Sequence, residues 1–406
     1  MSKGMETVGR KRARNGSGHI RRRTDGRWEA QYYFEGEKRS CYGSTEEECR
    51  HKLELIHIKI YKGAYRDASS MPLYVYLDRW NHQYIEVRPS THTSYDGYID
   101  GHIYNHQIGS IPLNKLKLED FIRFFRDKQT EGRRDGKPGG LSPKTLRNMR
   151  NMMAEALDYA VNVLKWLEIN PMLGLRTPKV KQPKIQVFNH SMQEKIETAA
   201  LLHPNINALM ILVDLYTGMR LGELCGMQWA DFSEDMDCFD IERILERLPV
   251  KWAEQNPEYT RIEMAGGKKD PKTALYLGRP KTDAGSRRIY LTDKSAWGFE
   301  RIRQYQKACG LYEPEGFVFK QANGNPYEGR GCIELYRDVL QKAGVDYQNF
   351  HTLRHTFATR AFELQFDIPT LAEILGHAQK STTENMYGHT MEETKRAAMG
   401  RFNQVG

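Results

Sequence analysis

A short connector near the middle of the chain, RTPKVKQPKIQVF over 176–188, places the strongest constraint on the fold. It holds two prolines and three lysines, and it has no acidic residue. Proline removes a backbone donor and fixes the backbone, so the connector is predicted to stay extended between folded parts. Its positive charge suits a path along a phosphate backbone, which makes Lys179, Lys181 and Lys184 candidate DNA contacts. We therefore expect a multidomain chain.

The composition is that of a soluble protein. The chain has 406 residues, of which 39% are hydrophobic and 28% charged, with a formal net charge of +9. The longest apolar run, INALMILVDLY, is too short to span a bilayer, and the basic amino terminus lacks the apolar stretch of a signal peptide. We expect a cytoplasmic protein without membrane contact.

The sequence shows no pattern typical of a metal or nucleotide site. Six cysteines are scattered without a C-x-x-C pair or a histidine at zinc-finger spacing, so neither structural zinc nor disulfides are predicted. We find no clustered Asp/Glu set for paired magnesium ions and no G-x-x-x-x-G-K-[ST] loop for ATP. We therefore expect no metal and no cofactor.

The first 69 residues combine a basic tail with a small predicted sheet. Three β-like segments, GHIRRR, RWEAQYYF and EKRSCYG, are separated by turn residues and followed by a helix. Such a sheet is narrow enough to enter the major groove of DNA, with arginine and tyrosine side chains on its outer face. The candidate DNA-binding residues in this region are Arg21, Arg22, Arg23, Arg27, Trp28 and Tyr32. A solvated basic surface is the alternative interpretation.

Residues 70–175 are predicted to form an all-α domain, with the connector as the linker that follows. The helix opened by Ser142 and Pro143 shows the clearest pattern, because apolar residues recur along it at steps of three and four. This stripe is expected to be core. The remainder, 189–406, alternates helices with a few strands, so the predicted class is multidomain α+β.

The segment YTGMRLGELCGMQW contains the first candidates for chemistry. The preceding apolar helix is expected to end at Gly218, and a new helical turn places Arg220 and Glu223 three residues apart on one face. An isolated R-x-x-E is most often a surface ion pair that contributes little to stability. Here the small and apolar neighbours favour close packing, which would hold the arginine in place.

Lys281, in GRPKTDAGSRRIYLT, is the next candidate. This stretch is predicted as two strands joined by a turn at 283–285, which puts Lys281 at the tip of a hairpin. A lysine at such a tip is most often merely solvated. Lys272, in the similar stretch DPKTALYL, is the competing choice, but only the later copy is followed at once by a turn and a strand.

Histidine and arginine gather near the carboxyl end, in HTLRHTFATR. On a helix, His351, Arg354 and His355 would share one face, although His355 is equally explained as a buried structural histidine. Downstream, a helix that stops in LGH leaves His377 at its exposed end. Tyr387 then lies about two turns into a further short helix.

Two arginines, a lysine, two histidines and a tyrosine suit phosphoryl transfer. Guanidinium groups can clamp the oxygens of a phosphodiester with forked hydrogen bonds and stabilise the charge that develops there. A tyrosine hydroxyl is a weak nucleophile, but nearby positive charge lowers the cost of its phenolate, and a histidine can take its proton. A lysine can protonate the departing oxygen. Nothing in this chemistry requires a metal.

These stretches resemble, in order, the boxes of the tyrosine recombinases, the phage integrase family, and in particular the integrases of conjugative transposons and temperate phages. TGMRLGEL, PKTDAGSRRI, HTLRH, LGH and the later tyrosine carry the resemblance over about half the chain, from 189 onward. The resemblance assigns catalytic roles to Arg220, Glu223, Lys281, His351, Arg354, His377 and Tyr387. It also implies an arm-type DNA-binding domain at 1–69, a SAM-like core-binding domain at 70–175, and a mainly helical catalytic domain with a small antiparallel sheet at 189–406.

The family's mechanism implies that Tyr387 forms a 3′-phosphotyrosine and releases a 5′-hydroxyl, without ATP. Four protomers would assemble on two DNA duplexes, at attachment sites of core and arm type, and pass through a Holliday junction. The implied activity is integration and excision of a mobile element, in a bacterial cell and associated with the nucleoid. Family analogy also suggests an excisionase and a host DNA-bending protein as accessory partners.

Two rival functions stay open at this point. A non-catalytic DNA-binding or architectural protein would explain the charge and the basic arm, but it leaves the ordered catalytic set unexplained. A type IB topoisomerase-like enzyme would share the chemistry but relax supercoils, and the arm-like sheet argues against it.

Two further segments have open interpretations. The polar stretch 249–272 is longer than the family's usual strand connection, and it is either an extra hairpin that contacts DNA or a partner or a solvated insertion. The tail TMEETKRAAMGRF, which begins at Thr390, is hypothesised to dock on a neighbouring protomer.

Overall fold

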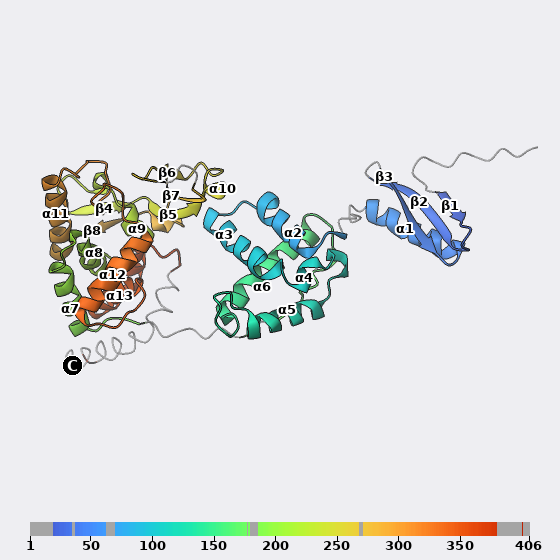
Figure 1. The fold of residues 1–406 in the computed structure, drawn as a ribbon, viewed down its shortest axis with the longest axis horizontal. Helices are drawn as coiled ribbons and strands as arrows, with labels where there is room; N and C mark the ends of the chain where they lie inside the picture. Colours follow the sequence, from blue (N-terminus) through green and yellow to red (C-terminus); the bar gives the residue numbers. More distant parts are fainter. Residues whose placement is uncertain are drawn as a thin grey trace, which may run out of the picture. The chain divides into compact units, whose positions relative to one another are not determined.

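The computed structural model describes residues 19–34, 37–61, 70–176, 178, 186–267, 271–379 and 400. Contacts divide the chain into two compact units, residues 1–180 and 181–406, whose elements are labelled in Figure 1. The predicted α+β class is confirmed. In the described part of the chain, no helix is both long and apolar enough to cross a membrane.

A three-stranded antiparallel sheet opens the first unit, in the order β1-β2-β3. Its elements are β1 (His19–Arg22), β2 (Trp28–Phe34), β3 (Glu37–Gly43) and the helix α1 (Glu46–Tyr61). Helix α1 packs on one face of the sheet (Figure 1), where Ala30, Tyr32, Cys49 and Leu53 form a small core. The predicted sheet backed by one helix is confirmed.

The alternation of side chains along β2 decides which residues face α1. Ala30 faces the helix, so Trp28 and Tyr32, two residues away on either side, face it as well. Tyr32 is only 4% exposed, and Trp28 packs against the same core. The prediction that these two aromatic side chains lie on an outer, DNA-facing surface is therefore wrong. Tyr42 of β3 lies on the open face instead.

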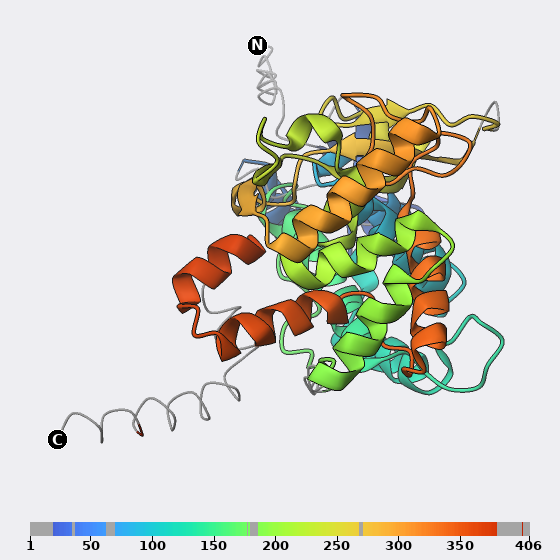
Figure 2. The same ribbon diagram turned by 90° about the vertical axis from the view of Figure 1, so that its left-hand side faces the viewer.

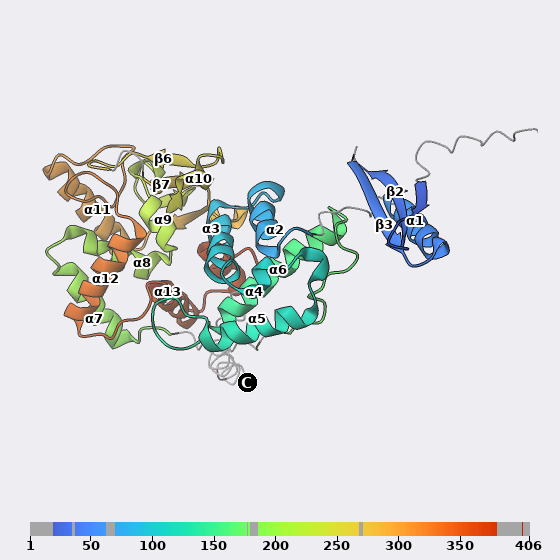
Figure 3. The same ribbon diagram turned by 45° about the vertical axis from the view of Figure 1, so that its right-hand side comes forward.

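A helical bundle follows in the first unit (Figure 3). Its helix α6 (Pro143–Asn162) begins where predicted, because the Ser142 hydroxyl accepts a hydrogen bond from the Thr145 amide at 3.1 Å. The apolar stripe of α6 shares one core with aromatic side chains that include Trp80 and Phe124. The other elements are α2 (Leu73–Arg79), η2 (Trp80–Tyr84), α3 (Pro89–Tyr98), η3 (Ile99–Ile103), α4 (Gln107–Ser110), η4 (Leu113–Lys115) and α5 (Leu118–Glu131).

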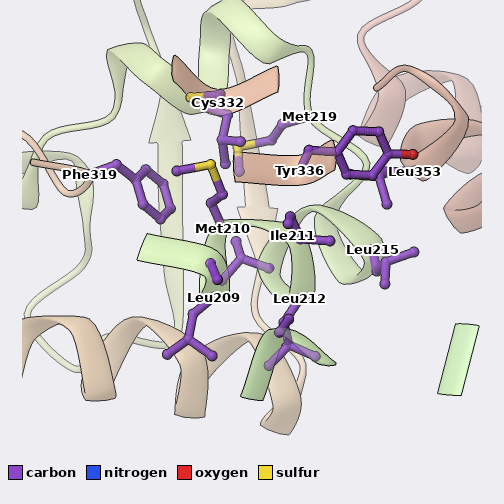
Figure 4. Close-up of a cluster of buried hydrophobic side chains, with 14 of the residues drawn as sticks. Leu209, Met210, Ile211, Leu212, Leu215, Met219, Phe319, Cys332, Tyr336 and Leu353 are labelled. Carbon is purple, nitrogen blue, oxygen red and sulfur yellow. The ribbon is translucent and has the colours of Figure 1, made fainter. Parts of the chain in front are cut away.

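Helix α8 (Leu209–Thr217) forms the centre of the second unit. All of its residues except Tyr216 are buried, as expected for a helix that is apolar all round. Figure 4 shows its side chains among Phe319, Cys332 and Tyr336, which belong to the same core. The further helical elements are α7 (His190–Leu201), η5 (Ile206–Ala208), α9 (Leu221–Gly226), η6 (Trp229–Asp231), α10 (Val250–Ala253), η7 (Asp283–Gly285), α11 (Asp293–Ala308), α12 (Gly329–Ala343), α13 (Thr352–Glu363) and α14 (Ile368–Leu375).

Two small antiparallel sheets accompany these helices. Their strands are β4 (Cys238–Ile241), β5 (Ile244–Pro249), β6 (Thr260–Ile262), β7 (Thr273–Gly278) and β8 (Arg287–Tyr290). One sheet pairs β4 with β8, and the other has the order β5-β7-β6. Because β7 and β8 belong to different sheets, the predicted hairpin with Lys281 at its tip is wrong. The turn η7 redirects the chain between them, and Gly285 packs so tightly there that a Cβ would lie 2.5 Å from Pro280.

The polar stretch 249–272 is folded over its described part. It contains α10 and β6, and β6 pairs with β7 so that Arg261 lies opposite Tyr276. The stretch therefore adds an edge strand to the sheet of β5 and β7, and a contact of this stretch with DNA or a partner stays a prediction.

Helices α13 and α14 contact each other, and α13 also contacts α8 (Figure 2, where α13 and α14 are orange-red). His351 directly precedes α13, and His377 follows the end of α14. The fold thus brings together two stretches of sequence that carry predicted site residues.

Candidate active site

Helix α8 ends at a glycine that lets another helix approach closely. Gly218 has a φ of 62°, the left-handed conformation expected at a helix end. A Cβ at this position would lie 2.4 Å from the ring of Phe357 on α13. Both the turn and the packing therefore require glycine, and Arg220 follows as the residue that directly precedes α9.

Arg220 is fixed through both its backbone and its side chain. Its amide donates to Glu223 Oε2 at 2.9 Å, and its Nη1 donates to Glu223 Oε1 at 2.7 Å. Its Nη2 donates to the carbonyl oxygen of Gly376 at 2.7 Å. The side chain is nevertheless 38% exposed, so part of the guanidinium remains accessible to a ligand.

Arg354 is almost completely buried, at 2% exposure. Its Nη1 donates to the carbonyl oxygen of Gly218 at 2.7 Å, and its Nη2 donates to that of Leu375. Burial first, and then the charge of Arg220, lowers the pKa of Arg354 to about 9, so the group stays charged at neutral pH. Arg220 and Arg354 therefore reach the carbonyls of adjacent residues and converge on one turn.

His351 and His377 enter the same region. His351 is an exposed residue, and its ring lies 4.7 Å from that of His355, centroid to centroid. Partial burial first, and then the nearby His355 and two arginines, lowers the pKa of His351 to about 4. Burial first, and then the charges of Arg354 and Arg220, lowers the pKa of His377 to about 4 as well. Both imidazoles are therefore neutral at neutral pH, the form that can act as a base.

Arg287 belongs to this cluster although the sequence did not single it out. Its side chain is 4% exposed, and it donates to both carboxylate oxygens of Glu223, at 2.9 and 3.2 Å. Burial alone would raise the pKa of Glu223, but hydrogen bonds and charge from its arginine partners, Arg287 first, hold it below the ordinary value. Strand alternation was the available signal, because Arg287 shares the buried face of β8 with Ile289 while Arg288 faces outward.

A second carboxyl group, Asp214, lies fully buried near Arg354. Burial raises the pKa of Asp214 well above its ordinary value, against the opposing charge of Arg354. Three guanidiniums, those of Arg220, Arg287 and Arg354, face the carboxyl groups of Glu223 and Asp214, so they outnumber the negative charges even if both carboxyl groups are ionised. The cluster is therefore net positive, which favours a bound phosphodiester.

Lys281 lies in the connection from β7 to β8 and is exposed. The turn after it packs against the turn that receives the arginines, since a Cβ on Gly376 would lie 2.8 Å from the carbonyl oxygen of Ala284. The competing Lys272 precedes β7 and lies at the opposite end of that strand, in a pocket that Arg247 also lines. This placement favours Lys281 as the neighbour of the cluster.

The predicted DNA-binding arginines of the first unit are exposed: Arg21, Arg22, Arg23 and Arg27. On the open face of the sheet, the guanidiniums of Arg23 and Arg27 lie 5.6 and 6.0 Å from the ring centre of Tyr42. Four predicted residues lie outside the described residues, as does the tail that begins at Thr390, apart from Gly400: Lys179, Lys181, Lys184 and Tyr387. Across the described ranges, no group of three or more His, Cys, Asp or Glu side chains is arranged to hold a metal ion.

The sequence profile of the phage integrase family matches residues 186–394, a range that contains every residue of the cluster. The chain belongs to the phage integrase family. It is accordingly a tyrosine-type site-specific DNA recombinase, related to enzymes of phages and transposons.

Curated relatives extend this similarity beyond the profile. A XerC-like tyrosine recombinase of Caldanaerobacter subterraneus subsp. tengcongensis is 26% identical over 384 residues, which cover 91% of this chain and 92% of the relative. The integrase of Staphylococcus phage L54a is 20% identical and covers 84% and 96% of the two chains. The transposase of Tn916 from Enterococcus faecalis is 25% identical over 48% of this chain and 45% of its own.

Solved structures share the fold. The Tn1549 transposon integrase in complex with a circular intermediate DNA superposes with a TM-score of 0.64 at 20% identity, over 82% of this chain and 100% of the other. A lambda integrase tetramer bound to a Holliday junction gives a TM-score of 0.55 at 16% identity, over 93% and 96%. The predicted tyrosine-recombinase fold is thereby confirmed.

Proposed function

We propose that the chain exchanges DNA strands through a covalent phosphotyrosine intermediate formed by Tyr387. The observation that supports this most is the convergence of Arg220 and Arg354 on the carbonyls of one turn, at a net positive site. A phosphodiester bound there would receive charge-assisted hydrogen bonds. These strengthen as negative charge develops on its oxygens in the transition state.

In the proposed step, Tyr387 Oη attacks the scissile phosphorus while the bond to the 5′ oxygen breaks. The products are a 3′-phosphotyrosine and a free 5′-hydroxyl. His351, neutral before DNA binds, accepts or relays the phenol proton, and Lys281 protonates the departing oxygen. His377 donates a hydrogen bond to a non-bridging phosphate oxygen.

The proposed reaction uses neither ATP nor a metal ion. The phosphotyrosine linkage keeps the energy of the broken phosphodiester, so the 5′-hydroxyl of a partner strand can reverse the step and join new neighbours. The charge stabilisation that divalent cations give in many nucleases would come here from Arg220 and Arg354, with Glu223 as the residue that orients Arg220.

We also propose that four protomers act together on two duplexes and pass through a Holliday junction. The fold shared with the lambda integrase tetramer on such a junction supports this. The fold shared with the Tn1549 integrase on circular intermediate DNA supports integration and excision of a mobile element as the biological role. By family analogy the proposal includes an excisionase, a host DNA-bending protein and association with the bacterial nucleoid.

The parts of the chain have separate tasks in this proposal. Residues 1–69 bind arm-type sites through the arginines of the open sheet face, and residues 70–175 bind the core site. The linker at 176–188 follows the DNA backbone to the catalytic domain at 189–406. The exposed arginines beside Tyr42 support the first of these assignments.

The test uses nicked duplexes that cover the ends of the DNA element that encodes the chain. A nick traps the intermediate because the short strand diffuses away after cleavage. We expect a protein–DNA adduct that survives denaturant, forms in EDTA and is absent with Tyr387→Phe. Tight DNA binding without any adduct would contradict the proposed chemistry. Relaxation of supercoiled plasmid without joining of two sites would favour a topoisomerase-like activity instead.

A further inference from the structure

Arg287 binds three separate segments of the second unit. Its Nη2 donates to Glu223 Oε2 at 2.9 Å, and its Nη1 donates to the carbonyl oxygen of Gly285 at 2.9 Å. Its Nε donates to the carbonyl oxygen of Ile374. The side chain is 4% exposed, and all three of its guanidinium nitrogens donate to protein groups.

Each of these segments carries a residue of the proposed site. Glu223 also binds Arg220, at 2.7 Å. Gly285 closes the turn that follows Lys281, and Ile374 lies in the last turn of α14, just before His377. The buried guanidinium of Arg287 therefore links the parts of the chain that hold Arg220, the proposed general acid Lys281, and His377, the proposed hydrogen-bond donor to the phosphate.

Arg287 also affects the charge that the site can offer. Glu223 accepts hydrogen bonds from both Arg287 and Arg220, so one carboxylate is shared between two guanidiniums. Without Arg287, the carboxylate would be paired with Arg220 alone, which would draw that guanidinium inward and weaken its hold on a phosphate.

We propose that Arg287 is a positioning residue that keeps Arg220 oriented and its charge available for the scissile phosphate, by binding Glu223 and the carbonyls of two neighbouring turns. This inference rests on the proposed function, because it concerns the same cleavage step.

Single-turnover adduct formation on a nicked duplex, at saturating protein, tests the inference. Arg287→Met should slow the rate on the order of 100-fold, because small misplacements of catalytic groups have effects of that size. DNA affinity should stay unchanged. Arg288→Met is the matched control, since this neighbour on β8 is 56% exposed and binds Asp240 at 2.8 Å on the surface. It should keep the wild-type rate.

A second replacement separates positioning from simple packing. If the charge of Glu223, no longer shared with Arg287, draws Arg220 away from the phosphate, then Arg287→Met/Glu223→Gln should recover at least about tenfold of the lost rate. A packing role would instead lower the melting temperature and the fraction of protein that forms adduct, with no recovery. A wild-type rate for Arg287→Met, or no recovery in the double variant, overturns the inference.

Arg287→Lys decides the question if the methionine variant does not fold. Lysine keeps the charge but cannot bridge Glu223 and two carbonyls at once, so the rate should fall about tenfold with a full yield of adduct. A wild-type rate for this variant overturns the inference. Wild-type protein that forms no adduct would refute the phosphotyrosine proposal itself, so the two failures are distinguishable.

Discussion

Arg220 and Arg354 donate to the carbonyl oxygens of the adjacent residues Gly376 and Leu375, although their surroundings differ sharply. Arg354 is 2% exposed, whereas the side chain of Arg220 is 38% exposed. One guanidinium is therefore part of the protein core, and the other reaches the surface. The two should respond differently to replacement.

Arg220→Lys and Arg354→Lys should both slow adduct formation, by about 10²- to 10³-fold, because each removes a forked donor to the phosphate. Only Arg354→Lys should lower the melting temperature, because a lysine cannot satisfy both the Gly218 and Leu375 carbonyls and leaves a buried acceptor unpaired. Nicked-duplex assays and calorimetry measure the two effects. Equal melting temperatures for both variants would contradict the structural role of Arg354.

Gly376→Ala should impair cleavage as well as stability. Gly376 and Gly344 both have a φ of +64°, so alanine at either position should cost about 1 kcal/mol of folding free energy. A Cβ on Gly376 would also lie 2.8 Å from Ala284 O and 2.8 Å from an Arg287 nitrogen, whereas a Cβ on Gly344 meets nothing within 4 Å. Gly344→Ala is therefore the control. Full adduct formation by Gly376→Ala would show that this turn is not tightly constrained.

His351 and His377 should make stability depend on pH. Each has a pKa of about 4 in the folded protein, below the ordinary 6.5, so the unfolded state binds more protons between these values. Their contribution to stability is present above 6.5 and is lost as the pH falls toward 4. Between about pH 7 and about pH 5, the melting temperature of His351→Gln/His377→Gln should fall less steeply than that of the wild type. Parallel curves would indicate that these histidines titrate normally.

Lys281→Ala should slow cleavage by about 10²-fold, the usual scale for loss of a general acid, while Lys272→Ala should not. In a duplex with sulfur in place of the bridging 5′ oxygen, the leaving group is a 5′-thiolate, which needs no proton from a general acid. This substrate should restore the rate of Lys281→Ala in a single-turnover assay. A loss that persists with the sulfur substrate would mean that Lys281 acts in another way.

Arg23→Ala/Arg27→Ala should weaken binding to arm-type DNA. The slope of log affinity against log salt concentration should also fall by the equivalent of about two phosphate contacts. Tyr32→Ala should instead unfold the small sheet, because Tyr32 is a core residue at 4% exposure. Binding titrations at several salt concentrations and circular dichroism separate the two effects. Unchanged affinity in the double-arginine variant would indicate that the open face of the sheet does not contact DNA.

Local signals in the sequence predicted much of what positions the candidate site. Gly218 and Gly376 end their helices with positive φ, as expected from the residues around them. Arg220 and Glu223 are close enough in sequence for their pairing to be foreseen. Alternation along β8 placed Arg287 on the same face as Ile289, but Arg287 was missed because its hydrogen-bond partners belong to α9 and α14, which lie far away in the sequence.

The two wrong predictions have a related cause. Strands β7 and β8 are neighbours in the sequence but pair with other strands, and a turn between them does not reveal this. Alternation along β2 separates its two faces, but it does not say which face α1 covers, so Trp28 and Tyr32 were assigned to the wrong side. The catalytic role of Tyr387 remains a prediction, because this residue lies outside the described part.

The arginines of the cluster donate to main-chain oxygens at Gly218, Gly285, Ile374, Leu375 and Gly376. Every residue type supplies such an oxygen, so the side chains of Ile374 and Leu375 can drift without loss of these hydrogen bonds, provided that the backbone path is kept. Side chains of this kind around the cluster can therefore be substituted during evolution while the positions of the guanidiniums stay the same. A cluster anchored in this way gives a physical reason why relatives that have diverged to 20% identity still share one fold.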